Sequence, residues 1–578
     1  MIASESFVEL FSRFIVPGDH IRSDYLGLIK EIVARKRREG AVWQEPLAAA
    51  YRLLFQEIKD NRLRPVDTIS FGTSGWRGKL GKDISVRSTA LVTAAIVQMY
   101  ENLATDSDLR DPLGIESLAE AQQRGCVLGF DNRFAGPLLA ANVAFVLADK
   151  GFRVHYAGES TTGVLSAAVL KLHAAFSINL TPSHNPLDYG GYKFNAADAG
   201  PAASQVTERI TANARKLVEQ DYIPEKTPAT IEEVMRAFPH VQPFDSLATW
   251  KQLVRENQPV HGLDFDLAIA TFLQRDDMVV AVDCVHGASR LHIRELFNHT
   301  VKPALIVLRD TADVTFGGVA PEPSTANMRT VVETLQKNTA TLKLGTIIDP
   351  DGDRIRFTDG TTEITMNQFG AMAYHFLHEY KSKRGMVAKT VATSNLANGI
   401  AAAFGEELYE PSVGFKNFKP VIGRALVYFE ESDGISIIGH TPEKDAYIGL
   451  LLALEMLLAT NMNLGDYLKS IEEQYGTYYP ERDGVVVSVK GEELLRLLAG
   501  LAKYQVGSTV MVGDAARRIA EIITIDGQKM VFEDGSWLMI RPSGTEPKVR
   551  FYVESRTPAG TSDLVTTAKN MLVETGIL

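Results

Sequence analysis

Residues 344–354 read LGTIIDPDGDR, an apolar run that leads directly into an acidic loop. The run Leu344–Ile348 predicts a buried strand, because apolar and β-branched residues in unbroken series suit a strand that is covered on both faces. In α/β proteins, polar loops at the ends of such strands carry the chemistry. This stretch therefore predicts a functional site in an α/β domain.

Strand, polar loop and helix alternate in the same way from Ile69 onward. The further predicted strands are Cys126–Phe130, Phe152–Tyr156, Phe176–Leu180 and Met278–Val282, with a helix at Leu138–Asp149. This alternation favours α/β units with mostly parallel sheets. Toward the C-terminus the pattern changes, and three runs predict antiparallel strands in a smaller α+β domain: Gly484–Val489, Met530–Phe532 and Trp537–Ile540.

Residues 1–66 predict an appended helical segment. Phe7–Ile15 carries apolar residues at helical spacing, and further amphipathic stretches occupy Tyr25–Ile32 and Glu45–Lys59. The basic cluster Arg35–Arg38 is interpreted as a solvated helix end, with a binding patch as the alternative. The segment is expected to pack on the first domain or to support oligomerisation.

Composition limits the possible partners. The length of 578 residues predicts several domains, and the net charge of −11 argues against duplex nucleic acid and anionic membranes. Cys126 and Cys284 lack metal-ligand spacing and are expected to be buried thiols. The longest apolar run, Ile448–Thr460, contains Glu455 and is shorter than a membrane helix requires. With no pattern of a signal peptide, the sequence predicts a cytoplasmic protein.

The acidic loop places carboxylates at three alternate positions, Asp349, Asp351 and Asp353. Their mutual repulsion favours a hard cation between them, and oxygen-only ligands indicate Mg²⁺ rather than zinc. An EF-hand begins with the same pattern, but Arg354 stands where it needs Gly, and Gly360 stands where it needs Glu. A solvated acidic loop is the remaining alternative.

A second polar loop, TPSHNP at residues 181–186, follows the predicted strand Phe176–Leu180. Its prolines and asparagine predict a tight turn that presents Ser183. A serine hydroxyl becomes a useful nucleophile only with help from a base or a metal. His184 is adjacent in sequence, and the G-x-S-x-G elbow of esterases is absent. The loop is therefore either a simple turn or a catalytic unit.

Two further loops could bind a phosphorylated sugar. RPSGTEP at residues 541–547 combines a guanidinium, hydroxyls and an exposed glycine backbone, which suits a phosphate cradle or a simple turn. FEESDG at residues 429–434, followed by Lys444, offers carboxylates and a hydroxyl to a sugar, or is an ordinary polar loop. The nucleotide motifs G-x-x-x-x-G-K-[ST] and G-x-G-x-x-G are absent, so nucleotide use is unsupported.

Taken in their order along the chain, and together with FGTSGWRG at residues 71–78, the four loops resemble those of the α-D-phosphohexomutases over residues 67–578. The resemblance implies four domains around a central cleft: three with mixed α/β sheets and a C-terminal α+β domain. The implied domains and their loops are 67–245 with the serine loop (181–186), 246–360 with the metal loop (349–354), 361–475 with the sugar loop (429–434), and 476–578 with the phosphate loop (541–547). GGYKFN at 190–195 is similar to the bacterial phosphoglucomutase branch, whereas the sugar and phosphate loops look more like the branch of phosphopentomutase-like enzymes.

The resemblance also implies roles for individual residues. The expected Mg²⁺ ligands are Asp349, Asp351, Asp353 and Ser183, which is also the expected phosphoserine. The residues expected around the phosphoryl-transfer centre are Arg77, His184, Lys193 and Arg354, with either His184 or Lys193 as general base. The residues expected to bind substrate are Lys416, Glu430, Ser432, Arg541, Ser543, Gly544 and Thr545.

The activity that the resemblance favours is a Mg²⁺-dependent phosphoglucomutase reaction through a phosphoserine enzyme, with glucose 1,6-bisphosphate as intermediate and activator. A phosphomannomutase, phosphopentomutase or hexose-bisphosphate synthase would use the same chemistry, and a catalytically silent sugar-phosphate-binding protein is an alternative of another class. The expected partner is a small sugar phosphate, and the chain is expected to be a monomer or homodimer. Three positions depart from the family pattern. Phe429 stands where many members have Gly, Asp433 stands where an apolar residue or Gly is usual, and Arg356 stands where the residue is commonly small.

Overall fold

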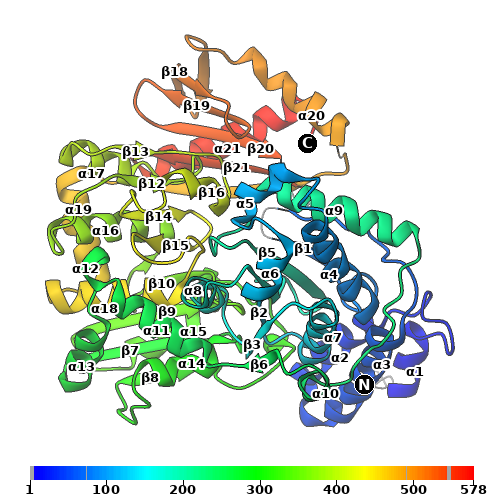
Figure 1. Ribbon diagram of the computed structural model, residues 1–578. Helices are drawn as coiled ribbons and strands as arrows, with labels where there is room; N and C mark the ends of the chain where they lie inside the picture. The colour runs from blue at the N-terminus through cyan, green and yellow to red at the C-terminus, as the bar shows by residue number, and fades with distance from the viewer. Residues whose placement is uncertain (1–5, 73–74, 490, 543–547) are drawn as a thin grey trace.

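The computed structural model describes residues 6–72, 75–489, 491–542 and 548–578 of the chain. Four sheets follow one another along the sequence, and helices cover them (Figure 1). The N-terminal helices and the first sheet lie on one side of the molecule, the second and third sheets lie on the other, and the C-terminal domain lies above both. The predicted set of three mixed α/β domains and a C-terminal α+β domain is confirmed.

The first domain is built on a six-stranded sheet with the order β1-β5-β4-β2-β3-β6. Its strands are β1 (Trp76–Lys79), β2 (Cys126–Phe130), β3 (Val154–Glu159), β4 (Phe176–Leu180), β5 (Tyr189–Asn195) and β6 (Val241–Pro243). Its helices are α4 (Val86–Glu101), α5 (Arg110–Leu113), α6 (Leu118–Arg124), α7 (Gly136–Asp149), α8 (Thr162–Leu172), α9 (Ser204–Glu219) and α10 (Ile231–Ala237). Because β2 and β4 are parallel neighbours, their carboxyl ends meet at one edge, and the serine loop leaves the sheet there.

The second and third domains carry smaller mixed sheets, with the orders β11-β10-β9-β7-β8 and β13-β12-β14-β15. The second domain contains β7 (Met278–Asp283), β8 (Leu305–Leu308), β9 (Leu342–Ile348), β10 (Ile355–Thr358), β11 (Glu363–Ile364), α11 (Ser246–Glu256), α12 (Gln258–His261), α13 (Phe265–Gln274), α14 (Ser289–Leu296) and α15 (Thr325–Gln336). The third contains β12 (Val387–Lys389), β13 (Leu408–Tyr409), β14 (Val427–Glu430), β15 (Gly434–Ile437), α16 (Met366–Glu379), α17 (Leu396–Phe404), α18 (Ala446–Thr460) and α19 (Leu464–Tyr475).

One hydrophobic core runs through the second and third domains. Helix α18 is buried from Ala446 to Leu457 and packs against β9 of one sheet and β15 of the other. Its largely apolar sequence, interrupted by Glu455, is explained by this central position between two sheets. Within the described ranges, no single helix has the length and apolar composition of a membrane span, and α18 and α19 meet those criteria only as a pair bent by 77°.

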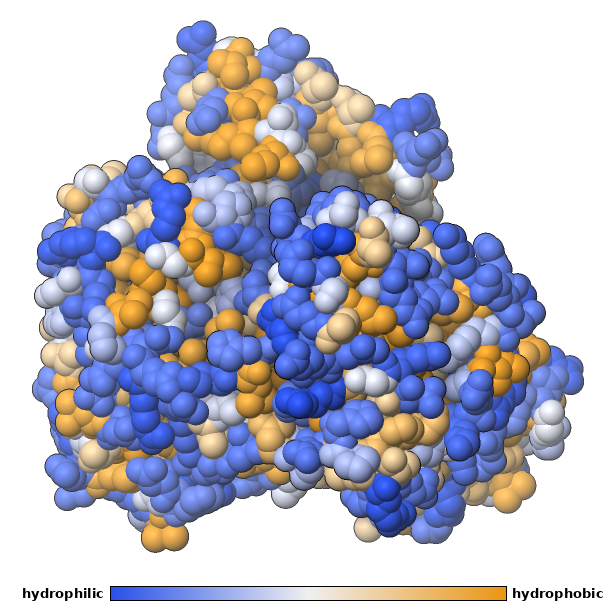
Figure 2. Space-filling view, in the orientation of Figure 1, coloured by the Kyte–Doolittle hydropathy of each residue, from blue (hydrophilic) through white to orange (hydrophobic). Residues whose placement is uncertain are grey.

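The C-terminal domain has its own core and a fully antiparallel sheet with the order β16-β21-β20-β19-β18-β17. Its elements are β16 (Tyr479–Val486), α20 (Gly491–Leu498), β17 (Thr509–Val512), β18 (Ala515–Ile523), β19 (Gln528–Phe532), β20 (Trp537–Pro542), β21 (Lys548–Ser555) and α21 (Pro558–Glu574). Figure 2 shows that the surface recedes beneath this domain, between it and the rest of the molecule.

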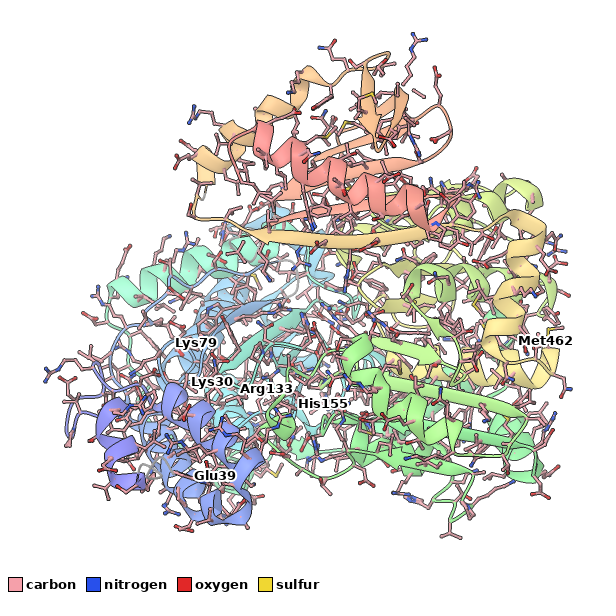
Figure 3. All side chains as sticks on the ribbon, turned by 180° about the vertical axis from the view of Figure 1, so that it is seen from behind. Lys30, Glu39, Lys79, Arg133, His155 and Met462 are labelled. Atoms are coloured by element: carbon pink, nitrogen blue, oxygen red, sulfur yellow. The ribbon has the colours of Figure 1, made fainter. Side chains whose placement is uncertain are left out.

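The N-terminal helices pack on the first domain and join its hydrophobic core, which agrees with one of the two expectations for this segment. They are α1 (Phe7–Phe14), α2 (Tyr25–Glu39) and α3 (Gln44–Asp60). Lys30 of α2 and Lys79 of β1 lie side by side in Figure 3, and both donate to the carboxylate of Asp188, just beyond the serine loop. In the predicted basic cluster, Arg37 donates to the carbonyl of Gly318 in the second domain at 3.2 Å.

Two predicted strands differ from the observed ones for identifiable reasons. The structure places β3 at Val154–Glu159 rather than Phe152–Tyr156, because the amides of Phe152 and Arg153 donate to helical carbonyls instead of the sheet. It places β16 at Tyr479–Val486 rather than from Gly484 onward. This strand lies at the edge of its sheet and is mostly exposed, so its polar first half was not recognisable as a strand.

Candidate active site

Ser183 lies in the serine loop between β4 and β5. Its φ of +58° is in the left-handed region, which costs a non-glycine residue ~1 kcal/mol. The backbone N–H of Ser183 donates to Thr181 Oγ1 at 2.9 Å and so helps to fix the turn. Ser183 Oγ donates to Asp349 Oδ2 at 2.7 Å and lies 3.3 Å from His184 Nδ1. The hydroxyl of the first domain therefore meets the metal loop of the second.

Arg133 braces the serine loop from behind. Its guanidinium donates to the carbonyls of Ser183 and Pro186, each at 2.6 Å, and to that of Asn185. The side chain is buried, lies 4.6 Å from the centre of the Phe316 ring, and comes from the loop after β2 near the seam between the first and second domains (Figure 3). Arg133 was not among the predicted residues, although its position directly after the strand β2 was a usable signal.

Arg133→Met is expected to loosen the serine loop. Three carbonyls of the serine loop would lose a charged donor and the buried carboxylate of Asp131 would lose its paired cation, so the opening free energy of the β4 and β5 amides should fall by about 3 kcal/mol. Native-state hydrogen exchange measures this quantity. Arg64→Met is the control, because its ion pair with Asp221 is exposed to solvent on both sides and contributes little to stability. Unchanged exchange in Arg133→Met would contradict the bracing role.

The metal loop gathers the three predicted carboxylates. Asp349, Asp351 and Asp353 are all buried, and one carboxylate oxygen from each lies within 4.8 Å of the others. Asp349 Oδ1 accepts the backbone N–H groups of Asp353 and Arg354, both at 3.0 Å, and this bonding shapes the loop. Burial, with the neighbouring Asp351 and Asp353, raises the pKa of Asp349 well above its usual value. Asp351 Oδ1 is buried without a hydrogen-bond partner. These oxygens fit a hard divalent cation such as Mg²⁺.

Two residues of the first domain dock onto the metal loop. Lys193 Nζ lies 2.6 Å from Asp351 Oδ2 and 2.6 Å from Asp353 Oδ2. Although burial opposes its charge, these two carboxylates hold the pKa of Lys193 above its usual value. Thr162, at the start of α8, donates its backbone N–H to the Asp351 carbonyl and its hydroxyl to Asp351 Oδ2, both at 2.7 Å. The first and second domains therefore build this centre together.

The sugar loop is a tight hairpin turn between β14 and β15. Glu430 and Gly434 face each other across it, and Ser432 Oγ donates to Glu430 Oε1 at 2.9 Å. Lys444 Nζ lies 3.5 Å from Glu430 Oε1 and 3.4 Å from Asp353 Oδ2. This buried ammonium therefore links the sugar loop to the metal loop.

A cleft of about 650 Å³ connects these loops, and all four domains contribute to its walls. Of the predicted residues, it is lined by Arg77, His184, Arg354, Glu430, Ser432 and Arg541. Ser183 and the three aspartates lie behind this wall, buried. A volume of this size suits a small phosphorylated ligand.

The other residues predicted to bind substrate do not line the cleft in the described part of the structure. Gly414 and Phe415 line it, whereas Lys416 Nζ contacts Ser204 Oγ at 2.8 Å, on the first domain. The predictions for Ser543, Gly544 and Thr545 fall on residues outside those that the structure describes.

Several cleft cations were not predicted. Lys444 comes from the third domain, and the C-terminal domain contributes Arg482, Lys548 and Arg550. Lys548, Arg550 and Tyr552 occupy alternate positions of β21 and so share one face of the sheet, and Arg541 pairs in register with Arg550. This alternation is visible in the sequence and was a usable signal. Arg541, Lys548 and Arg550 thus lie together on one wall of the cleft, where a phosphate could bind.

Comparison with known proteins agrees with this geometry. Models of the four domains of the phosphoglucomutase/phosphomannomutase family match the chain: α/β/α domains I, II and III at residues 112–221, 260–362 and 365–475, and the C-terminal domain at residues 489–568. The chain belongs to the phosphohexomutase family. Membership identifies it as an enzyme of the mutase type.

Three relatives share about a quarter of their aligned residues with this chain. Phosphoglucomutase-1 of Bos taurus is 24% identical over 486 residues, which cover 76% of this chain and 84% of the relative. A phosphoglucomutase of Komagataeibacter xylinus is 26% identical over 528 residues (84% and 87%), and a probable phosphoglucosamine mutase of Methanosphaera stadtmanae is 25% identical over 503 (84% and 94%). A putative phosphomannomutase structure from Thermus thermophilus superposes with a TM-score of 0.68 at 24% identity, covering 88% of this chain and 99% of that one. The fold is shared, whereas the sugar differs among these names.

Proposed function

We propose that this phosphohexomutase is a Mg²⁺-dependent phosphoglucomutase that uses Ser183 as its phosphorylated residue. The observation that carries the proposal is the 2.7 Å contact between Ser183 Oγ and Asp349, one of three buried carboxylates that lie behind the wall of the cleft. A pure binding protein has no need of a phosphorylatable hydroxyl at a metal loop. Asp349, Asp351, Asp353 and an oxygen on Ser183 would hold Mg²⁺, which neutralises negative charge on a phosphoryl group.

The chain's own residues support phosphoryl transfer in both directions. The phosphoryl group on Ser183 passes to the free hydroxyl of a hexose monophosphate: the bond from phosphorus to serine oxygen breaks and one to the sugar oxygen forms. Arg77 and Arg354 line the cleft beside the serine loop and stabilise charge on the transferring oxygens. The resulting glucose 1,6-bisphosphate turns over in the cleft and returns its other phosphoryl group to Ser183.

His184 is the better candidate for the general base. Burial, with the nearby Arg354 and Arg77, lowers the pKa of His184 well below its usual value, so its imidazole is neutral and can accept the proton of the attacking hydroxyl. Lys193 is an ammonium held between two carboxylates and has no lone pair to offer. We therefore assign Lys193 to holding the metal loop.

The C-terminal domain supplies the grip for the phosphate that does not react. Arg541, Lys548 and Arg550 line the cleft on this domain, whereas the serine loop lies on the first domain. One such grip serves both orientations of the bisphosphate, because either phosphate can occupy it. The same cations bind glucose 1,6-bisphosphate as the activator that loads Ser183.

Glucose 1-phosphate is expected to be the preferred substrate. The support comes from the phosphoglucomutase relatives that match three quarters or more of the chain. We expect kcat/KM for glucose 1-phosphate to exceed that for the mannose, glucosamine and ribose 1-phosphates by ~10-fold or more. Steady-state assays with all four compounds under identical conditions measure this. A clear preference for another sugar would contradict the proposed substrate but not the proposed phosphoryl transfer through Ser183.

A further inference from the structure

Two of the three positions that depart from the family pattern contact each other. Arg356 Nη2 lies 2.7 Å from Asp433 Oδ2, and its Nε lies 3.2 Å from Asp433 Oδ1. The pair is bidentate and buried, with side-chain exposures of 11% and 2%. Arg356 lies on β10, directly after the metal loop, and Asp433 lies in the sugar loop. Both departures therefore form one connection between two loops of the site.

The backbone at Asp433 strengthens this connection. Its φ of +71° is left-handed, a conformation that hairpin turns usually give to glycine. The Asp433 carbonyl accepts the backbone N–H of Ile355 at 2.9 Å, so β10 holds this residue by its main chain as well as by its carboxylate. A glycine would adopt this turn with less strain, but it could not pair with Arg356. Aspartate at this position is therefore explained by the pair and not by the turn.

The third residue that departs from the family pattern, Phe429, packs at the other end of the same hairpin. Phe429 is buried at the end of β14, and a Cβ atom built on Gly370 of α16 would lie 2.1 Å from its ring. The bulky Phe429 is therefore accommodated by the absence of a side chain at Gly370. The sugar loop is thus held at both ends by residues that depart from the family pattern.

We propose that Arg356 and Asp433 are positioning residues that set the distance between the sugar loop and the metal loop and thereby determine which sugar reacts. Asp433 adjoins Ser432, whose hydroxyl bonds Glu430, so a shift at Asp433 moves the groups offered to the sugar. Arg356 lies on β10, three positions after Asp353, so a shift of the metal loop also moves Arg356. This proposal rests on the proposed function only in that its readout uses sugar phosphates.

The test compares Arg356→Gln, Asp433→Asn and Asp433→Gly with wild type. We expect the ratio of kcat/KM for glucose 1-phosphate to that for mannose 1-phosphate to fall about tenfold in each variant, since a small misplacement of a sugar-binding group is costly. Asp433→Gly is the sharpest variant, because it relaxes the turn while removing the carboxylate. The double variant Arg356→Gln/Asp433→Asn should be no worse than either single variant.

Glu363→Gln is the matched control. Glu363 is the other carboxylate partner of Arg356, at 3.0 Å, and does not touch the sugar loop, so its loss should leave the sugar ratio unchanged. Variants that keep the wild-type ratio would overturn the proposal, as would an equal loss for every sugar. Hydrogen exchange at the Ile355 amide gives a readout without substrate: faster exchange in Asp433→Gly supports the connection and unchanged exchange overturns it. A wild-type protein inactive on every sugar phosphate would instead refute the proposed function.

Discussion

Ser183→Ala should lose at least ~10⁴-fold in mutase activity, the loss typical of removing a nucleophile. The substitution removes the oxygen atom that contacts Asp349 and that accepts the phosphoryl group in the proposed mechanism. Intact mass provides a second measurement, since phosphorylation adds about 80 Da. We expect a heavier fraction in wild type after incubation with glucose 1,6-bisphosphate and none in Ser183→Ala.

Ser166→Ala is the matched control for this prediction. Ser166 is another buried serine of the first domain, and its hydroxyl donates to the Ala199 carbonyl, away from the metal loop. Its loss should leave both the activity and the heavier fraction in place. Wild-type activity in Ser183→Ala would exclude the phosphoserine mechanism. A wild-type protein without activity or added mass would favour the silent sugar-phosphate-binding protein.

Removal of the divalent cation should lower the rate by ~10³-fold, because a bound cation contributes several kcal/mol of charge stabilisation. EDTA followed by dialysis prepares the depleted protein, and added Mg²⁺ should restore the rate. Asp351→Asn should cause a loss of similar size by weakening cation binding. Asp351 Oδ1 is buried without a hydrogen-bond partner, and Asp351 Oδ2 accepts hydrogen bonds from Lys193 Nζ and Thr162 Oγ1.

Calorimetric titration with Mg²⁺ separates cation binding from activity. Asp359→Asn is the control, because Asp359 is a nearly buried carboxylate that accepts the amides of Thr361 and Thr362 and lies outside the triad. This variant should bind Mg²⁺ as wild type does. An EDTA-treated protein that retains the full rate, or Asp351→Asn with wild-type Mg²⁺ affinity, would contradict the assignment of the metal loop.

The sequence predicted those parts of the site that are contiguous in the chain. The strand Leu344–Ile348 and its three aspartates could be recognised together, because an unbroken apolar run and a carboxylate cluster are local signals. Ser183 could be placed at the end of β4 for the same reason. The fold class followed from repeated alternation of strands and helices, which does not depend on exact strand ends.

The parts that escaped prediction depend on contacts between distant residues. Arg133 resembles an ordinary loop residue until it meets carbonyls some 50 positions away. Arg356 and Asp433 were each recognisable as unusual, but 77 positions separate them, and neither residue by itself indicates its partner. Phe152 was assigned to a strand by its apolar side chain, whereas its backbone bonds elsewhere. The hydrophobicity of a side chain can be read locally from the sequence, whereas the partner of a backbone amide depends on the tertiary fold.

The contact between Ser183 and Asp349 also constrains when the enzyme can become active during its synthesis. The ribosome must add 166 residues after Ser183 before Asp349 exists. Until the second domain has emerged and docked through Thr162 and Lys193, the nascent first domain carries its serine loop without the carboxylates that face it. In the proposed mechanism, a chain that ends before the second domain therefore lacks the carboxylates that phosphoryl transfer at Ser183 requires.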